Sequence, residues 1–108
     1  MTLNIYNPNN CPVRNALTVL GSKWVLIILA NLDKSKRYSE LKRDISNITE
    51  KMLIEKLKLL EEKKFITRKD YKLIPPKVEY KITEFGKESL LLIPILQNIG
   101  LKMFENTK

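Results

Sequence analysis

The sequence predicts a mainly α-helical domain with one small β-hairpin, which is an α+β class. Apolar residues recur at helical spacing in five segments of the chain, whereas KVEYKIT at 77–83 alternates apolar and polar side chains as a half-buried strand does. The chain has 108 residues, of which 44% are hydrophobic and 30% charged. That is enough for one hydrophobic core and is typical of a single globular domain.

The first part of the chain predicts a loose arm and two helices. Residues 1–10 are polar and rich in turn-forming residues, so we expect them to form an N-terminal arm. A helix is expected over 12–20, because Pro12 suits the first helical turn and Gly21 suits a helix end. The next segment begins with Ser22, a good N-cap, and its apolar face is so wide that this second helix must be central to the core.

Two further helices, with a short turn between them, are expected over 39–46 and 49–62, capped by Ser39 and Thr49. Such a pair is a candidate helix-turn-helix. In that motif the second helix enters the major groove of DNA with its N-terminal residues, while the first helix crosses the backbone. An ordinary antiparallel helix pair with a solvated outer face is the alternative, because such pairs are common.

A hairpin directly after the second helix of this pair favours the DNA-binding interpretation. A strand is expected at 66–71, and the alternating strand returns antiparallel to it. The Pro75–Pro76 pair cannot donate to a sheet ladder, so it lies at the hairpin tip, with Lys72 and Lys77 on either side. A stiff tip that brings lysine to a phosphate or to the minor groove makes a winged helix-turn-helix. The alternative is a turn that protects a sheet edge from aggregation.

The last helix, expected from about Glu84 to Phe104 with Thr83 as its N-cap, is apolar on more than one face. One side would pack on its own domain and the other on a second subunit, which predicts a homodimer. Pro94 removes one amide and is expected to bend this helix. The alternative is a helix buried within one subunit. The predicted interface comprises Leu92, Ile95, Leu96, Ile99 and Met103.

The composition limits the classes of function. A net charge of +8 favours a polyanionic partner, nucleic acid first and an anionic membrane surface second, although lysine can also simply keep a small protein in solution. Histidine is absent, which removes the commonest general base and the commonest zinc ligand. We find neither paired carboxylates nor a glycine-rich phosphate loop. We therefore expect no enzymatic activity, no cofactor and no metal.

The sequence also bears on the compartment in which the protein works. Its single cysteine, Cys11, excludes an internal disulfide framework and suits a reducing cytosol. No hydrophobic run is long enough to span a bilayer, and the N-terminus lacks the basic-then-apolar layout of a signal peptide. We expect a cytoplasmic protein that does not contact a membrane.

Three segments of the chain agree with one known pattern. They read CPVRNALTVLGSKW at 11–24, RYSELKRDISNITEKMLIEKLKLLEE at 37–62 and PPKVEYKITEFG at 75–86. In order and spacing they resemble the HxlR-type winged helix-turn-helix transcription regulators, which are bacterial relatives of the MarR regulators. The agreement of three motifs is far more specific than one short pattern. The resemblance implies a homodimer that binds a near-palindromic operator in double-stranded DNA, usually as a repressor and sometimes as an activator.

The resemblance also implies roles for individual residues. It makes 11–108 the DNA-binding domain, with its terminal helices forming the dimer. Such proteins often carry Thr and Gln where this chain has Ile54 and Glu55, which leaves the operator sequence open but not the binding mode. Lysine can bind guanine or a phosphate, and glutamate can accept a hydrogen bond from cytosine. The predicted DNA-binding residues are Ser39, Thr49, Lys51, Met52, Glu55, Lys58, Lys72 and Lys77.

Cys11 directly precedes Pro12 at the start of the first helix, where amide groups and the helix dipole favour a thiolate. A cysteine here is a feature of similar regulators, some of which sense oxidants or electrophiles through it, so the resemblance implies a redox switch. The alternative is a small packing residue without chemistry, since many buried cysteines are inert. The sequence also leaves open whether a small-molecule inducer regulates the protein.

The second class of function that the sequence allows is an interaction module. A winged-helix module can bind another protein or RNA without any operator specificity. The basic face of the predicted recognition helix argues against this class, because it suits the phosphates and base edges of a duplex.

Overall fold

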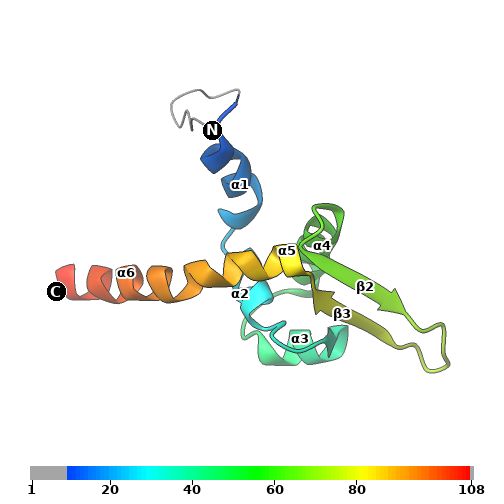
Figure 1. Ribbon diagram of the computed structural model, residues 1–108. Coiled ribbons are helices and arrows are strands. Elements are labelled where there is room, and N and C mark those ends of the chain that lie inside the picture. The colour runs from blue at the N-terminus through cyan, green and yellow to red at the C-terminus, as the bar shows by residue number, and fades with distance from the viewer. Residues whose placement is uncertain (1–9, 108) are drawn as a thin grey trace.

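The computed structural model describes residues 10–107 and shows a mainly helical domain with one small antiparallel sheet (Figure 1). This confirms the predicted fold class. A two-stranded hairpin extends from one side of the body, and the last helix extends from the opposite side. The elements in chain order are α1 (Pro12–Leu20), α2 (Val25–Ala30), β1 (Lys36–Arg37), α3 (Tyr38–Asp44), α4 (Glu50–Glu62), β2 (Ile66–Asp70), β3 (Val78–Ile82), α5 (Glu84–Lys87), the 3₁₀ turn η1 (Glu88–Leu91) and α6 (Leu92–Asn106).

The hydrophobic core lies where α2, α3 and α4 meet the base of the sheet. Helix α2 is central, as predicted, and α4 buries one stripe of leucines spaced by three and four residues. None of the helices found between residues 10 and 107 has the length and apolar content that crossing a bilayer requires. The largest fully buried side chains are those of Val25, Ile28, Leu29, Leu32, Leu41, Leu53, Leu57, Leu60 and Ile66.

The sheet has three strands in the order β1-β3-β2. Strand β3 shows the predicted alternation, because Tyr80 and Ile82 are buried while Lys81 between them is exposed. The third strand is a finding that the sequence did not predict. Strand β1 is only two residues long and pairs antiparallel with β3, Lys36 opposite Tyr80. Two residues are too few to show an alternating pattern.

Two of the predicted helix starts are wrong. Helix α2 begins at Val25 rather than after Ser22, whose carbonyl instead accepts a hydrogen bond from the Val25 amide at 3.3 Å in the turn before the helix. Helix α3 begins at Tyr38, so Ser39 lies inside it and does not cap it. The reason is Glu40, whose Oε1 accepts a hydrogen bond from the Arg37 amide at 2.9 Å and so fixes the start of α3 earlier.

The last helix is not continuous. Thr83 caps it as predicted, since its Oγ1 accepts the Gly86 amide at 2.9 Å. The helix then tightens into the 3₁₀ turn η1 before α6 begins. The irregularity therefore precedes Pro94 by about one turn. Pro94 has no amide to bond the carbonyl of Leu90, four residues earlier, so the regular α-helical ladder cannot run through this point.

Candidate nucleic-acid interface

Helix α4 packs one side against the core and exposes the opposite face to solvent. Its start is fixed by Thr49, whose Oγ1 accepts the Met52 amide at 3.1 Å. The buried leucine stripe anchors one side of the helix. On the other side Lys51, Glu55 and Lys58 are exposed, at the spacing that places side chains on one helical face. The exposed face of α4 therefore presents an amine, a carboxylate and a second amine together.

The turn between α3 and α4 is fixed by burial. Ile45 and Ile48, on either side of it, are 3% and 2% exposed. Between them Asn47 has a φ of 68°, a left-handed conformation that asparagine tolerates better than most residues. This arrangement sets the position of α4 relative to α3, as a helix-turn-helix requires.

The hairpin of β2 and β3 forms the wing. Tyr71 organises the end of its ladder: the Tyr71 amide donates to the Lys77 carbonyl oxygen at 2.9 Å, and the Tyr71 hydroxyl bonds Glu79 Oε1 at 3.2 Å. The Nζ atoms of Lys69 and Lys77 lie 4.5 and 4.3 Å from the centre of the Tyr71 ring. Such cation–π contacts hold both amines close to the hairpin.

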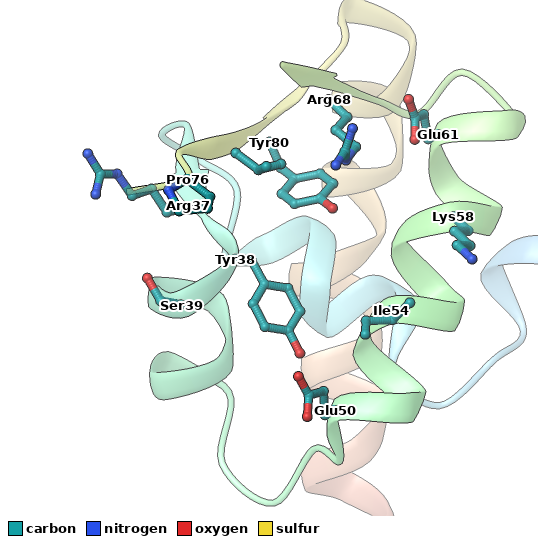
Figure 2. Close-up of a pocket in the computed structure, with 11 residues that line it drawn as sticks. Arg37, Tyr38, Ser39, Glu50, Ile54, Lys58, Glu61, Arg68, Pro76 and Tyr80 are labelled. Carbon is teal, nitrogen blue, oxygen red and sulfur yellow. The ribbon is translucent and has the colours of Figure 1, made fainter. Parts of the chain in front are cut away.

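A hollow of about 660 Å³ opens between α3, α4 and the wing (Figure 2). Helix α4 forms one wall, the start of α3 forms another, and strands of the sheet form the third. Its basic side chains come from three different elements: Arg37 from β1, Lys58 from α4 and Arg68 from β2. The full lining is Arg37, Tyr38, Ser39, Glu50, Ile54, Lys58, Glu61, Arg68, Pro76, Val78 and Tyr80.

The hydroxyl of Tyr38 is a buried polar group in this hollow. Its oxygen is buried and has no hydrogen-bond partner among the described residues, although it points toward the Glu50 carboxylate in Figure 2. Burial, and after it the negative charge of Glu50, raises the pKa of Tyr38 above its usual value. Tyr38 is therefore a neutral hydrogen-bond donor at physiological pH.

The basic residues of this surface are available to a partner. The salt bridges found between residues 10 and 107 are Lys36–Asp44, Arg43–Asp44 and Lys87–Glu84. The first two lie on α3 and β1, where hydrogen bonds from Arg43 and Lys36 hold the pKa of Asp44 below its usual value. Within that part of the chain, none of the cations of α4, the hollow or the wing forms a salt bridge, although the carboxylates of Glu50 and Glu61 also line the hollow.

A helix-turn-helix followed by a basic wing is thus established by geometry. Residues 19–107 match the HxlR-like helix-turn-helix family. The chain belongs to the HxlR-like family. The predicted resemblance is confirmed, and the match covers the helix pair, the wing and the last helix of this HxlR-like protein.

Relatives of known sequence or structure agree with this. The HTH-type transcriptional regulator YkvN of Bacillus subtilis is 45% identical over 91 residues, which are 83% of this chain and 75% of YkvN. A MarR-family protein from Porphyromonas gingivalis W83 has a similar structure, with a TM-score of 0.76, 40% identity and coverage of 93% of this chain and 96% of that one. The oxidised form of the redox regulator HypR has a similar structure, with a TM-score of 0.68 and 37% identity over 91% of this chain and 97% of HypR.

The predicted DNA-binding residues of this HxlR-like chain fall into two groups. Thr49, Lys51, Glu55 and Lys58 line the exposed start and face of α4, and Ser39 is exposed on α3 beside it. The second group is more varied. Met52 is half-buried and packs against the core, the Lys77 amine lies over the Tyr71 ring, and Lys72 is exposed at the wing tip. Arg37 and Arg68 belong to the same surface, and the sequence did not single them out.

Helix α6 carries the predicted dimer residues and buries no side chain in the described part of its own chain. Leu92, Ile95, Leu96, Ile99 and Met103 are between 38% and 61% exposed. They recur at spacings of three and four residues, so they form one stripe along the helix. Residues 10–107 therefore do not bury this stripe within their own subunit.

Cys11 lies at the start of α1 and is 7% exposed. Its Sγ accepts a hydrogen bond from the Arg14 amide at 3.4 Å, so the thiol caps the helix. Helix α1 exposes two large apolar side chains, Val13 and Leu17, which are 50% and 57% exposed. The predicted arm lies outside the described residues, apart from Asn10.

Proposed function

We propose that this HxlR-like protein is a cytoplasmic, non-enzymatic transcriptional regulator that binds a near-palindromic operator as a homodimer. Helix α4 would enter the major groove and the wing would lie over the neighbouring minor groove. The observation that carries this proposal is the exposed face of α4, where Lys51, Glu55 and Lys58 stand opposite the buried leucine stripe.

The side chains of this face suit base recognition in the major groove. Lys51 would donate to the O6 and N7 acceptors of guanine, and Glu55 would accept from the N4 amino group of cytosine. Ile54 is 41% exposed and suits the methyl group of thymine. The operator half-site would then combine these bases.

The hollow beside α4 suits the phosphate backbone. A DNA strand runs between the major groove and the adjacent minor groove, so its phosphates would pass between the recognition helix and the wing. Arg37, Lys58 and Arg68 would contact these phosphates. Phosphate contacts fix register and affinity rather than sequence.

The two-fold symmetry of the proposed operator requires a dimer. We assign residues 11–108 to a domain whose terminal helices, α1 and α6, dimerise. The exposed stripe on α6 supports this assignment, because a second copy would cover it. Repression is the proposed outcome, as the family resemblance implies.

Regulation through Cys11 is a second part of the proposal. Support comes from the similar structure of HypR, which is described as a redox regulator, and from the place of Cys11 as the cap of α1. Oxidation would give a bond between subunits, a mixed disulfide with a small thiol, or a sulfenic acid. Any of these would displace the cap of α1 and change the dimer. Diamide should lower DNA affinity of the wild type but not of Cys11→Ser; equal affinity of oxidised and reduced wild type would make Cys11 structural.

The test of DNA binding is a gel shift with sheared genomic DNA at low and moderate salt. Lys51→Ala should weaken the sequence-specific complex by about 1–3 kcal/mol. The matched control is Lys63→Ala, the same loss of charge just past the other end of α4, about 18 Å away along the helix. If the two variants bind alike, α4 does not read bases. If wild type binds RNA or protein but no duplex, the protein is an interaction module instead.

A further inference from the structure

The tip of the wing is apolar although the wing is basic. Leu73, Ile74, Pro75 and Pro76 follow one another at the tip, and all four are exposed. Ile74 is 101% exposed and Leu73 is 54% exposed. A single apolar residue on a surface needs no explanation, but an exposed run of this length is unfavourable unless it has a function.

The tip is held in one shape by its own backbone. The pair Tyr71–Lys77 closes the loop through the hydrogen bond between the Tyr71 amide and the Lys77 carbonyl. Inside it, the Lys72 amide donates to Asp70 Oδ1 at 2.8 Å. Two prolines restrict the backbone further. The apolar side chains are therefore presented by a preorganised loop, which lowers the entropy cost of binding.

Positive charge surrounds this apolar tip. Lys69 lies near the end of β2, and Lys72 and Lys77 lie in the loop between β2 and β3. None of the three forms a salt bridge among the described residues. The nearby carboxylates are Asp70 and Glu79, which bond the Lys72 amide and the Tyr71 hydroxyl. An apolar protein surface would not require such a ring of amines. The DNA minor groove does require such amines, because two rows of phosphates border it.

From this combination we propose that Leu73 and Ile74 form a wedge that enters the DNA minor groove beside each half-site. The wedge partly unstacks one base step and bends the duplex toward the major groove, as apolar side chains inserted there do. Lys72 and Lys77 bind the phosphates on either side. The inference rests on the proposed function and adds to it a specific action of the wing on DNA shape.

A sequence preference follows from this mechanism. Pyrimidine–purine steps, above all TA and CA/TG, unstack and kink most easily. The operator should therefore carry such a step where each wing tip lies, outside the bases that α4 reads. A dimer would place two wedges, one at each end of the operator.

The test measures the bend in fragments that carry the site recovered by selection from genomic DNA, in circular permutation with the site at different positions. Wild type should bend the DNA. Ile74→Ser should reduce the bend and weaken binding by about tenfold or more, from the burial lost at the tip. Lys72→Ala is the matched control: it should lower the salt slope by about one and keep the bend. Both side chains are exposed, so neither variant should alter the melting temperature.

The possible failures are distinguishable. If wild type binds the site but leaves it straight, or if Ile74→Ser bends it as wild type does, the wedge is wrong while the proposed recognition by α4 stands. If Ile74→Ser changes the mass of the free protein in sedimentation, the tip is a contact between copies, and the wedge is also wrong. If no duplex is bound by wild type at any salt concentration, the proposed function itself fails.

Discussion

Truncation of one side chain on the α6 stripe gives the sharpest test of the dimer. Ile99 is 49% exposed in the single chain, so about half of its side chain remains to be covered by a partner. Complete burial of an isoleucine contributes about 1.5–3 kcal/mol, so the half that is left contributes roughly 1 kcal/mol in each subunit. A two-fold interface contains Ile99 twice. Ile99→Ala should thus weaken the dimer by roughly 2 kcal/mol, which is about a 30-fold higher dissociation constant.

Sedimentation over a series of protein concentrations measures this change. The control is Gln97→Ala, a substitution on the same helix outside the apolar stripe, which should leave the dissociation constant unchanged. DNA binding should weaken together with dimerisation in Ile99→Ala, because two half-sites about 34–36 Å apart need two linked recognition helices. A wild type that is monomeric at micromolar concentration, or equal dissociation of the two variants, would show that the α6 stripe does not form a dimer interface.

Two further predictions concern the base of the wing and the hollow. Gly86→Ala should lower the free energy of unfolding by about 1–3 kcal/mol in urea titrations, because the added Cβ would overlap the carbonyl oxygen of Phe65, just before β2. The control is Gly100→Ala, whose Cβ meets no atom within 4 Å and which should not destabilise the protein. Equal losses of stability in the two variants would contradict the packing around Gly86. Tyr38→Phe should preserve or raise stability, since the hydroxyl that it removes is buried and has no hydrogen-bond partner among residues 10–107. Folding raises the pKa of Tyr38, so the unfolded chain releases this proton first, and the free energy of unfolding falls as pH rises above the ordinary tyrosine pKa. This fall should be smaller in Tyr38→Phe. An unchanged dependence of stability on pH in the variant would contradict the burial of this hydroxyl.

The sequence predicted those elements whose ends are marked by local chemistry. Pro12 and Gly21 delimit α1, and Thr49 caps α4, because each acts on the backbone within one turn of its own position. The alternation in β3 was equally clear, since one face of the strand is buried and the other is not.

Other features depend on contacts that a local pattern does not contain. Strand β1 exists because two residues pair with β3, which lies more than forty positions later in the chain. The hollow arises from the same pairing, since it brings Arg37 of β1 to the same hollow as Arg68 of β2. Each arginine alone is an ordinary surface cation. The start of α3 was misplaced because the Glu40 side chain competed successfully with a Ser39 cap.

Selection of bound fragments from a genomic library, followed by sequencing, tests whether a pair of α4 helices reads an operator. We expect one near-palindromic motif whose half-sites are centred about 10–10.5 base pairs apart, or a multiple of that distance. Repeating the selection with Lys51→Ala should relax the preference at one position in both halves of the motif, symmetrically. Fragments without a common motif, or an asymmetric motif that Lys51→Ala leaves intact, would contradict recognition by a pair of α4 helices.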